Sequence, residues 1–107
     1  MRFFALELSL EIIGKLRVLL PFIRRQDRKL FTQISTAASS VSLNLGEGSR
    51  RRGNDRTHLF RVAAGSAEEV RTGLRVAAAW GYFDERRARD VLADIDRLQR
   101  LLRGLGG

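Results

Sequence analysis

The sequence has 107 residues, no cysteine and a formal net charge of +8 at neutral pH. This length suits one domain over residues 1–107, and the lack of cysteine excludes a disulfide framework and a thiolate metal site. The positive charge favours polyanionic partners such as nucleic acid, because basic side chains neutralise phosphates and release their counterions. The absence of thiols also suits a reducing, cytoplasmic location.

The first predicted helix covers about residues 3–20 and is apolar on more than one side. Its apolar positions exceed the ~100° stripe that a surface helix needs, so a second buried face is expected. In a domain of this size, that face most simply meets another copy of the chain, which predicts a homo-oligomer. Glu7, Glu11, Lys15 and Arg17 interrupt the segment, so we expect neither a signal peptide nor a membrane span.

Pro21 is predicted to end the first helix, because proline lacks a backbone donor and cannot continue the ladder of hydrogen bonds. Residues 22–26 then form the first connection. Asp27 is the expected N-cap of a second helix over about residues 28–48.

Asp55 is the expected N-cap of a third helix that continues to about residue 80. Gly65 and Gly73 lie inside this helix, and each costs about 1 kcal/mol of helix stability relative to alanine. A helix that keeps such glycines usually packs closely there, so close packing is expected at both positions. Gly81 is predicted to close the third helix.

The fourth predicted helix covers about residues 85–103 and has a regular amphipathic stripe of aliphatic residues. Asp84 and Glu85 place negative charge at its start, where the helix dipole favours an acidic side chain. No stretch alternates with the period of a strand. Four helices with short connections predict an all-α fold, an antiparallel up-down-up-down four-helix bundle.

The second and third predicted helices form a hairpin whose facing positions are small. If the two helices run antiparallel, Ala37 and Ala38 fall near Ser66, and Ser40 falls near Ala63. Such a seam allows an interhelical distance at or below the short end of the usual ~8–10 Å. The predicted seam residues are Ser40, Asn44, Glu47, Gly48, Gly65, Ser66 and Glu69.

The polar residues of this seam have two interpretations. In the first, Glu47 and Glu69 are paired carboxylates and Asn44 orients a ligand. In the second, Asn44 and Glu47 satisfy backbone or arginine donors near the turn, and Ser66 hydrogen-bonds within the helix pair. The second is favoured, because no set of metal ligands or nucleophiles accompanies the carboxylates. His58 is the only histidine and is interpreted as a surface residue, so no catalytic residue, metal or cofactor is predicted.

Up-down topology gathers the basic residues at both ends of the predicted bundle. One end is expected to hold Arg24, Arg25, Arg28, Lys29, Arg86 and Arg87, and the other Arg2, Arg50, Arg51, Arg52, Arg56, Arg100 and Arg103. The candidate nucleic-acid-binding residues are Arg24, Arg25, Arg28, Lys29, Arg50, Arg51, Arg52 and Arg56. Because no base-reading motif is present, binding through charge and shape is expected.

Phe22, Trp80, Tyr82 and Phe83 are predicted to gather near the first of these ends. They could stack on nucleic-acid bases beside the neighbouring arginines. Such a group more often caps a bundle core or fills a contact between subunits, and these two roles are favoured here.

The predicted hairpin also carries a specific sequence pattern. Residues 33–48 (QISTAASSVSLNLGEG), Arg51 and residues 59–69 (LFRVAAGSAEE) resemble the four-helix bundle proteins of the 23S rRNA intervening-sequence family. That family typically shows a Gln-Ile segment, a Ser-hydrophobic-x-x-Asn-hydrophobic-Ala-Glu-Gly segment and an Ala-x-Gly-Ser-x-x-Glu segment. This sequence departs from the pattern at Gly46, where alanine is usual, and at residues 35–36, where basic residues are common.

The same fold is similar to the accessory variability protein of diversity-generating retroelements, a basic bundle that works with a reverse transcriptase and its RNA. Both groups imply a homopentameric ring, which agrees with a two-sided first helix. The resulting hypothesis is a non-enzymatic, oligomeric RNA-binding bundle, accessory to a reverse transcriptase or another RNA-processing enzyme. The alternative is a protein–protein scaffold that docks an acidic partner and has no nucleic-acid role. An enzymatic function has the least support.

Overall fold

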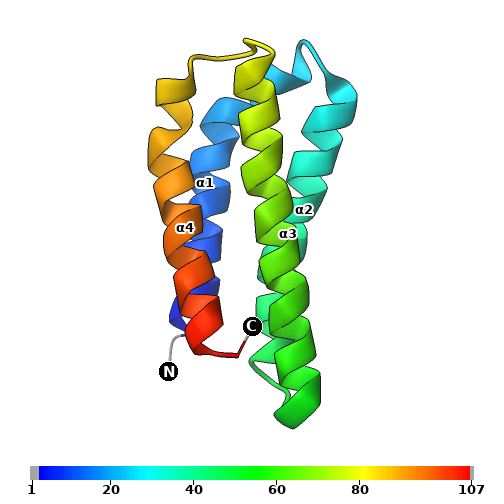
Figure 1. Ribbon diagram of the computed structural model, residues 1–107. Coiled ribbons are helices and arrows are strands. Elements are labelled where there is room, and N and C mark those ends of the chain that lie inside the picture. The colour runs from blue at the N-terminus through cyan, green and yellow to red at the C-terminus, as the bar shows by residue number, and fades with distance from the viewer. Residues whose placement is uncertain (1–2, 107) are drawn as a thin grey trace.

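The computed structural model describes residues 3–106, so Arg2 lies outside the described part of the chain. Four α-helices, α1 (Phe4–Arg24), α2 (Arg28–Gly48), α3 (Gly53–Ala79) and α4 (Arg89–Gly104), follow one another, and a short 3-10 helix, η1 (Glu85–Ala88), precedes α4. The four helices lie side by side, each antiparallel to the next (Figure 1). Between residues 3 and 106 there is no strand. The predicted all-α four-helix bundle is therefore confirmed.

Helix α1 continues beyond the position at which the sequence predicted its end. Pro21 lies inside α1, and the Arg25 amide donates to the Pro21 carbonyl at 3.2 Å in the final turn. A proline at this point removes one hydrogen bond, and the exposed position of Pro21 leaves its ring toward solvent. Burial of Ile23 in the core, with no exposed surface, stabilises the last turn, so the prediction that Pro21 ends the helix was wrong.

The two predicted N-caps have different outcomes. Asp27 caps α2 as predicted, because its Oδ1 accepts from the Leu30 amide at 3.0 Å. Asp55 is not a cap but lies in the first turn of α3, which begins at Gly53. Gly53 has a φ of +60°, a conformation that glycine adopts without strain, and this allows α3 to begin before Asp55.

Helix α3 ends in a Schellman motif built on Gly81, as the sequence predicted for this residue. The Gly81 amide donates to the Ala78 carbonyl at 2.9 Å, and the Tyr82 amide donates to the Ala77 carbonyl at 3.0 Å. Gly81 has a φ of +80°, which this motif requires of the residue after the cap. The motif fixes the position of Trp80, the C-cap residue.

The α2–α3 seam is close, but its register differs from the predicted one. The Ser66 hydroxyl donates to the Ser40 hydroxyl at 3.0 Å, so Ser66 lies about one helical turn from its predicted neighbours Ala37 and Ala38. Side chains lean toward the N-terminus of their own helix, and two antiparallel helices therefore meet in a shifted register. A Cβ added to Gly73 would lie 2.6 Å from Ile34 Cγ1, which confirms close packing there.

The core runs along the whole bundle and is mainly aliphatic, with Phe60 as its largest fully buried side chain. Helix α1 contributes to this core and also leaves Phe4, Leu10 and Val18 exposed to solvent. No helix in the described part of the chain is long and apolar enough to cross a membrane.

Candidate nucleic-acid interface

Ion pairs that join helices lie along the sides of the bundle. Lys15 of α1 bridges Asp90 and Asp94 of α4, with N–O distances of 2.9 and 2.6 Å. The hydrogen bonds to Asp94 and then Asp90 raise the pKa of Lys15 above its ordinary value. Arg71 of α3 pairs with Asp96 of α4 at 3.0 Å. Lys15 and Arg71 are thus neutralised on the sides, and most arginines at the two ends have no carboxylate partner within residues 3–106.

The end formed by residues 22–31 and 80–87, called the aromatic end below, holds guanidinium groups against aromatic rings. Arg25 and Arg87 both lie over the Phe22 ring, with distances to its centroid of 5.0 and 4.9 Å. Arg24 lies over the Phe31 ring at 5.5 Å. A guanidinium stacked in this way keeps its N–H edge free, and that edge suits phosphate oxygens. These three arginines form no ion pair in the structure of residues 3–106.

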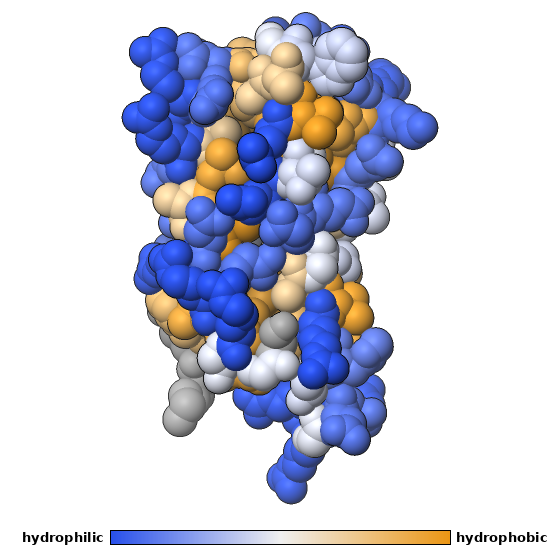
Figure 2. All heavy atoms as spheres, viewed as in Figure 1, coloured by the Kyte–Doolittle hydropathy of each residue, from blue (hydrophilic) through white to orange (hydrophobic). Residues whose placement is uncertain are grey.

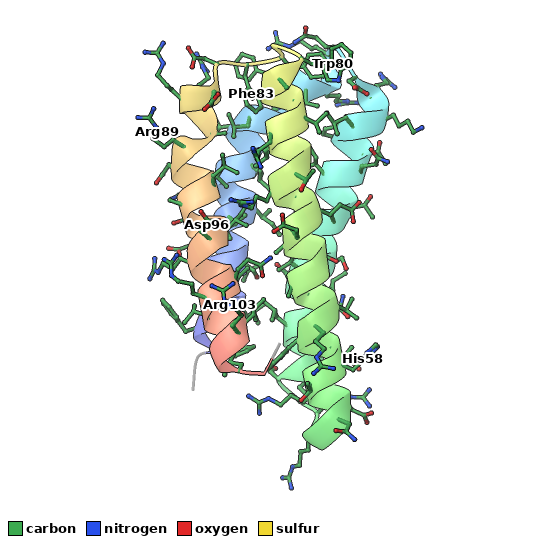
Figure 3. The ribbon with its side chains drawn as sticks, in the orientation of Figure 1. His58, Trp80, Phe83, Arg89, Asp96 and Arg103 are labelled. Carbon is green, nitrogen blue, oxygen red and sulfur yellow. The ribbon has the colours of Figure 1, made fainter. Side chains whose placement is uncertain are left out.

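Hydrogen bonds fix the loop between α3 and η1 at this end. The Tyr82 hydroxyl donates to Asp27 Oδ2 at 3.1 Å, and Gln26 donates to the Tyr82 carbonyl at 3.3 Å. Desolvation and the bond to Asp27 raise the pKa of Tyr82. Phe83 is buried under the loop, while Trp80 is 71% exposed and lies at the surface of this end (Figure 3).

Charges of the aromatic end are only partly neutralised. Asp84 caps η1 by accepting from the Arg86 amide at 2.9 Å, and it also pairs with the Arg86 side chain at 2.8 Å. The Arg86 hydrogen bonds hold the pKa of Asp84 below its ordinary value. Arg28 and Lys29 are exposed in the first turn of α2 and form no ion pair in the described chain. Most cations of this end therefore stay available to an anionic partner.

The opposite end, residues 47–56, is called the hairpin end and projects beyond the end of α4 (Figure 1). Arg51 pairs with Glu47 one turn earlier, and Arg56 lies over the buried Phe60 ring at 5.1 Å. Arg50 and Arg52 are exposed and, within residues 3–106, have no carboxylate partner. On the face shown in Figure 2, most side chains at this end are hydrophilic.

Arg100 and Arg103 do not join the hairpin end as closely as the sequence suggested. Both line an open groove between α3 and α4 together with Arg71, Asp96 and Gln99. Because α4 ends before the hairpin tip, Arg103 lies set back along the bundle (Figure 3). His58 is exposed on α3 between these levels, as expected of a surface residue.

The predicted seam residues separate into two groups. Ser40, Asn44, Gly48 and Ser66 lie in the α2–α3 interface, and the Asn44 amide donates to the Ser40 carbonyl at 2.8 Å and to its hydroxyl at 3.0 Å. A Cβ added to Gly48 would lie 2.7 Å from a Phe60 ring carbon. Asn44 acts within its own helix, and Ser66 bonds across the pair.

Gly65, Glu69 and Glu47 are exposed and do not belong to the seam interior. A Cβ added to Gly65 would meet nothing within 4 Å, so the expectation of close packing at this glycine was wrong. The reason is the helical face on which each residue lies. Gly65 and Glu69 lie on the solvent-exposed face of α3, whereas Ser66 lies on the face that contacts α2. In the described chain, no three His, Cys, Asp or Glu side chains gather in a way that could hold a metal ion.

Stacking of arginine on phenylalanine and the exposure of Trp80 are features that sequence reasoning did not identify. The four aromatic residues were placed at the correct end, but their individual environments were not distinguished. The sequence pattern identified Phe22 and Phe83 only as apolar residues. The contact between Arg87 of η1 and Phe22 of α1 arises only in the folded bundle. The Trp-Gly pair at the end of α3 was a usable signal, because a C-cap side chain before a Schellman glycine can point out of the bundle.

Comparisons with known proteins agree with this structure. No curated protein matches the chain. A solved structure of a protein with unknown function from the S23 ribosomal protein family of Bacteroides thetaiotaomicron has the same fold, with a TM-score of 0.85 and 18% identity over 95% of this chain and 97% of that one. Neither comparison names an enzymatic activity. The model of the 23S rRNA-intervening sequence protein family matches residues 5–104, and the chain therefore belongs to that family.

Proposed function

We propose that this protein is a non-enzymatic, oligomeric RNA-binding bundle that acts through its two basic ends. The observation that carries the proposal is the gathering of unpaired basic side chains at the two ends of the bundle. Within residues 3–106, Arg24, Arg25 and Arg87 at the aromatic end and Arg50 and Arg52 at the hairpin end form no ion pair. Unpaired guanidinium groups favour phosphate, because one planar group can donate two parallel hydrogen bonds.

The family description supports RNA as the polyanion, since its printed name refers to a sequence inserted in 23S rRNA. The resemblance to the accessory protein of diversity-generating retroelements supports a role beside a reverse transcriptase or another RNA-processing enzyme. Both associations support a cytoplasmic location and RNA, rather than a small molecule, as the ligand.

Self-association supports the same function. Helix α1 leaves Leu10 and Val18 exposed, at 48% and 66%, although it already buries another face in the core. Covering these side chains with a second copy would remove apolar surface from water. A homopentameric ring would repeat each basic end around its axis, and repetition increases the affinity for a long polyanion.

The test is a binding titration with a short unstructured RNA, followed by fluorescence anisotropy at about 50 and 200 mM salt. Light scattering first establishes the mass of the protein in solution. RNA binding that weakens steeply with salt is expected, because phosphate contacts release counterions. Absence of binding at the lower salt concentration would overturn the proposal and favour the alternative, a scaffold for an acidic protein partner.

A further inference from the structure

Trp80 occupies an unusual place for a large aromatic residue. It is the only tryptophan of the chain, and it is 71% exposed at the end of the bundle. Its backbone is held by the Schellman motif of α3 on one side and by the bonds of Tyr82 to residues 26 and 27 on the other. The indole is thus presented on a fixed loop, and binding a ligand there would require little ordering of the backbone.

The guanidinium groups at the same end of the bundle are also held in place before a ligand binds. Arg25 and Arg87 share the Phe22 ring, and Arg24 lies over Phe31. The Nε of Arg25 also donates to the Pro21 carbonyl at 3.3 Å, which fixes this guanidinium further and leaves its two terminal amino groups for a ligand. Stacking reduces the rotamer entropy that such long side chains lose on binding. The aromatic end therefore combines one free aromatic face with several fixed phosphate donors.

The positive charge of the aromatic end limits which kinds of partner can bind over Trp80. A second copy docked here would bring two sets of arginine and lysine residues together, and repulsion between like charges disfavours such a contact. A duplex offers phosphates, but its bases are already stacked on one another and cannot reach the indole. A single strand supplies both phosphates and unpaired bases, and each base has a face that can stack on tryptophan.

We infer that the aromatic end binds single-stranded nucleic acid, with one base stacked on Trp80 and the flanking phosphates bound by Arg24, Arg25 and Arg87. This inference rests on the proposed RNA-binding function and deepens it. The hairpin end, which has no exposed aromatic side chain, contacts phosphates only. The protein thus distinguishes single strands from duplexes at one end and not at the other.

Because Trp80 is the only tryptophan, the intrinsic fluorescence of the protein reports on this site directly. The experiment titrates the full chain with oligouridylate of about 12 nucleotides, with a duplex RNA of the same length, and with inorganic polyphosphate of equal charge. Anisotropy of labelled RNA gives the affinities independently of the indole. Oligouridylate is expected to quench Trp80 fluorescence, whereas duplex and polyphosphate bind without comparable quenching.

The variant Trp80→Leu is expected to lower the affinity for oligouridylate by about tenfold and to leave the affinity for duplex RNA unchanged. Leu43→Ala is the matched control, because Leu43 is 72% exposed on α2, far from the aromatic end, and its removal should change neither affinity. Far-ultraviolet circular dichroism checks that both variants keep their helices. Arg25→Gln in the wild-type background should weaken oligouridylate binding while Trp80 remains in place.

The outcomes separate this inference from the proposed function. RNA binding by the wild type without quenching, and with equal affinity for Trp80→Leu, overturns the inference but leaves the proposed function standing. Absence of binding to any nucleic acid overturns both. A tryptophan emission that is already blue-shifted in the free protein and shifts to red on dilution shows that a second copy covers Trp80, which also overturns the inference.

Discussion

The two ends of the bundle have the same sign of charge but present it on different surfaces. At the aromatic end, guanidinium groups are stacked on Phe22 and Phe31, and Trp80 stands exposed at the same end of the bundle. At the hairpin end, only Arg56 lies over a ring, that of the fully buried Phe60, and the other arginines extend from a polar turn without an exposed aromatic residue. Figure 2 shows the difference on one face, with pale and orange residues among the blue ones at the first end and mainly blue residues at the second.

This difference indicates that a count of arginines does not define a binding site. A cation on a flexible side chain provides attraction that salt screens and that carries little selectivity. A cation fixed over a ring beside an exposed aromatic face provides geometry, and geometry can distinguish a base from a phosphate. We therefore expect general affinity at the hairpin end and discrimination at the aromatic end.

The largest effect is expected when Arg50, Arg51 and Arg52 are changed together to serine. Loss of three cations from the hairpin end should reduce RNA affinity on the order of a hundredfold at low salt and lower the slope of log K against log salt by about 3. Single strands and duplexes should be affected equally. Anisotropy titrations at several salt concentrations give both quantities.

The matched control for that variant changes Arg17, Arg61 and Arg97 to serine, three exposed arginines on the sides of the bundle. It removes the same charge without touching either end. Equal losses of affinity in the two variants would show that net charge alone determines binding. That result would contradict the expectation that the hairpin end itself contacts RNA.

Close packing of α2 on α3 is the feature that the two ends have in common. Gly48→Val and Gly73→Val place a side chain where Phe60 and Ile34 already lie 2.7 and 2.6 Å from an ideal Cβ position, so each should destabilise the protein by about 1–3 kcal/mol. Urea unfolding followed by circular dichroism measures the loss. An unchanged midpoint for either variant would contradict the close seam at that end.

Gly65→Ala should have a smaller effect of opposite sign. The exposed Cβ would meet nothing within 4 Å, and alanine favours the helix interior, so stability should rise by about 0.5–1 kcal/mol. The same urea titration applies. A loss of stability would mean that the outer face of α3 is covered in solution, for example by another subunit.

The smallest expected effect concerns Asp84, whose pKa the hydrogen bonds from Arg86 lower in the folded state. A lowered pKa in the folded state stabilises the protein above the ordinary aspartate pKa, near about 3.9, and this stabilisation disappears as the pH falls through the folded value. Asp84→Asn keeps the cap of η1 but removes the charge. It should be slightly less stable than the wild type at pH 7 and equal to it in acid.

Much of the local structure could be predicted, because it depends on neighbours in sequence. The periodic apolar positions gave four helices, Asp27 was identified as the cap of α2, and Gly81 as the residue that closes α3. The predictions at Pro21 and Asp55 failed for a common reason. A buried Ile23 extends α1 past its proline, and Gly53 lets α3 begin early, so packing and backbone freedom overrode the local signals.

The sequence by itself determined the class of fold, the hairpin of small residues, the family pattern and the gathering of arginines at two ends, because these follow from periodicity, composition and chain direction. Only the tertiary structure decided the register that pairs Ser40 with Ser66, the outward position of Gly65, and the stacking of Arg87 on Phe22. These features depend on the rotation and displacement of each helix against its neighbours. Such rigid-body relations arise from packing among residues far apart in the chain, and no local pattern encodes them.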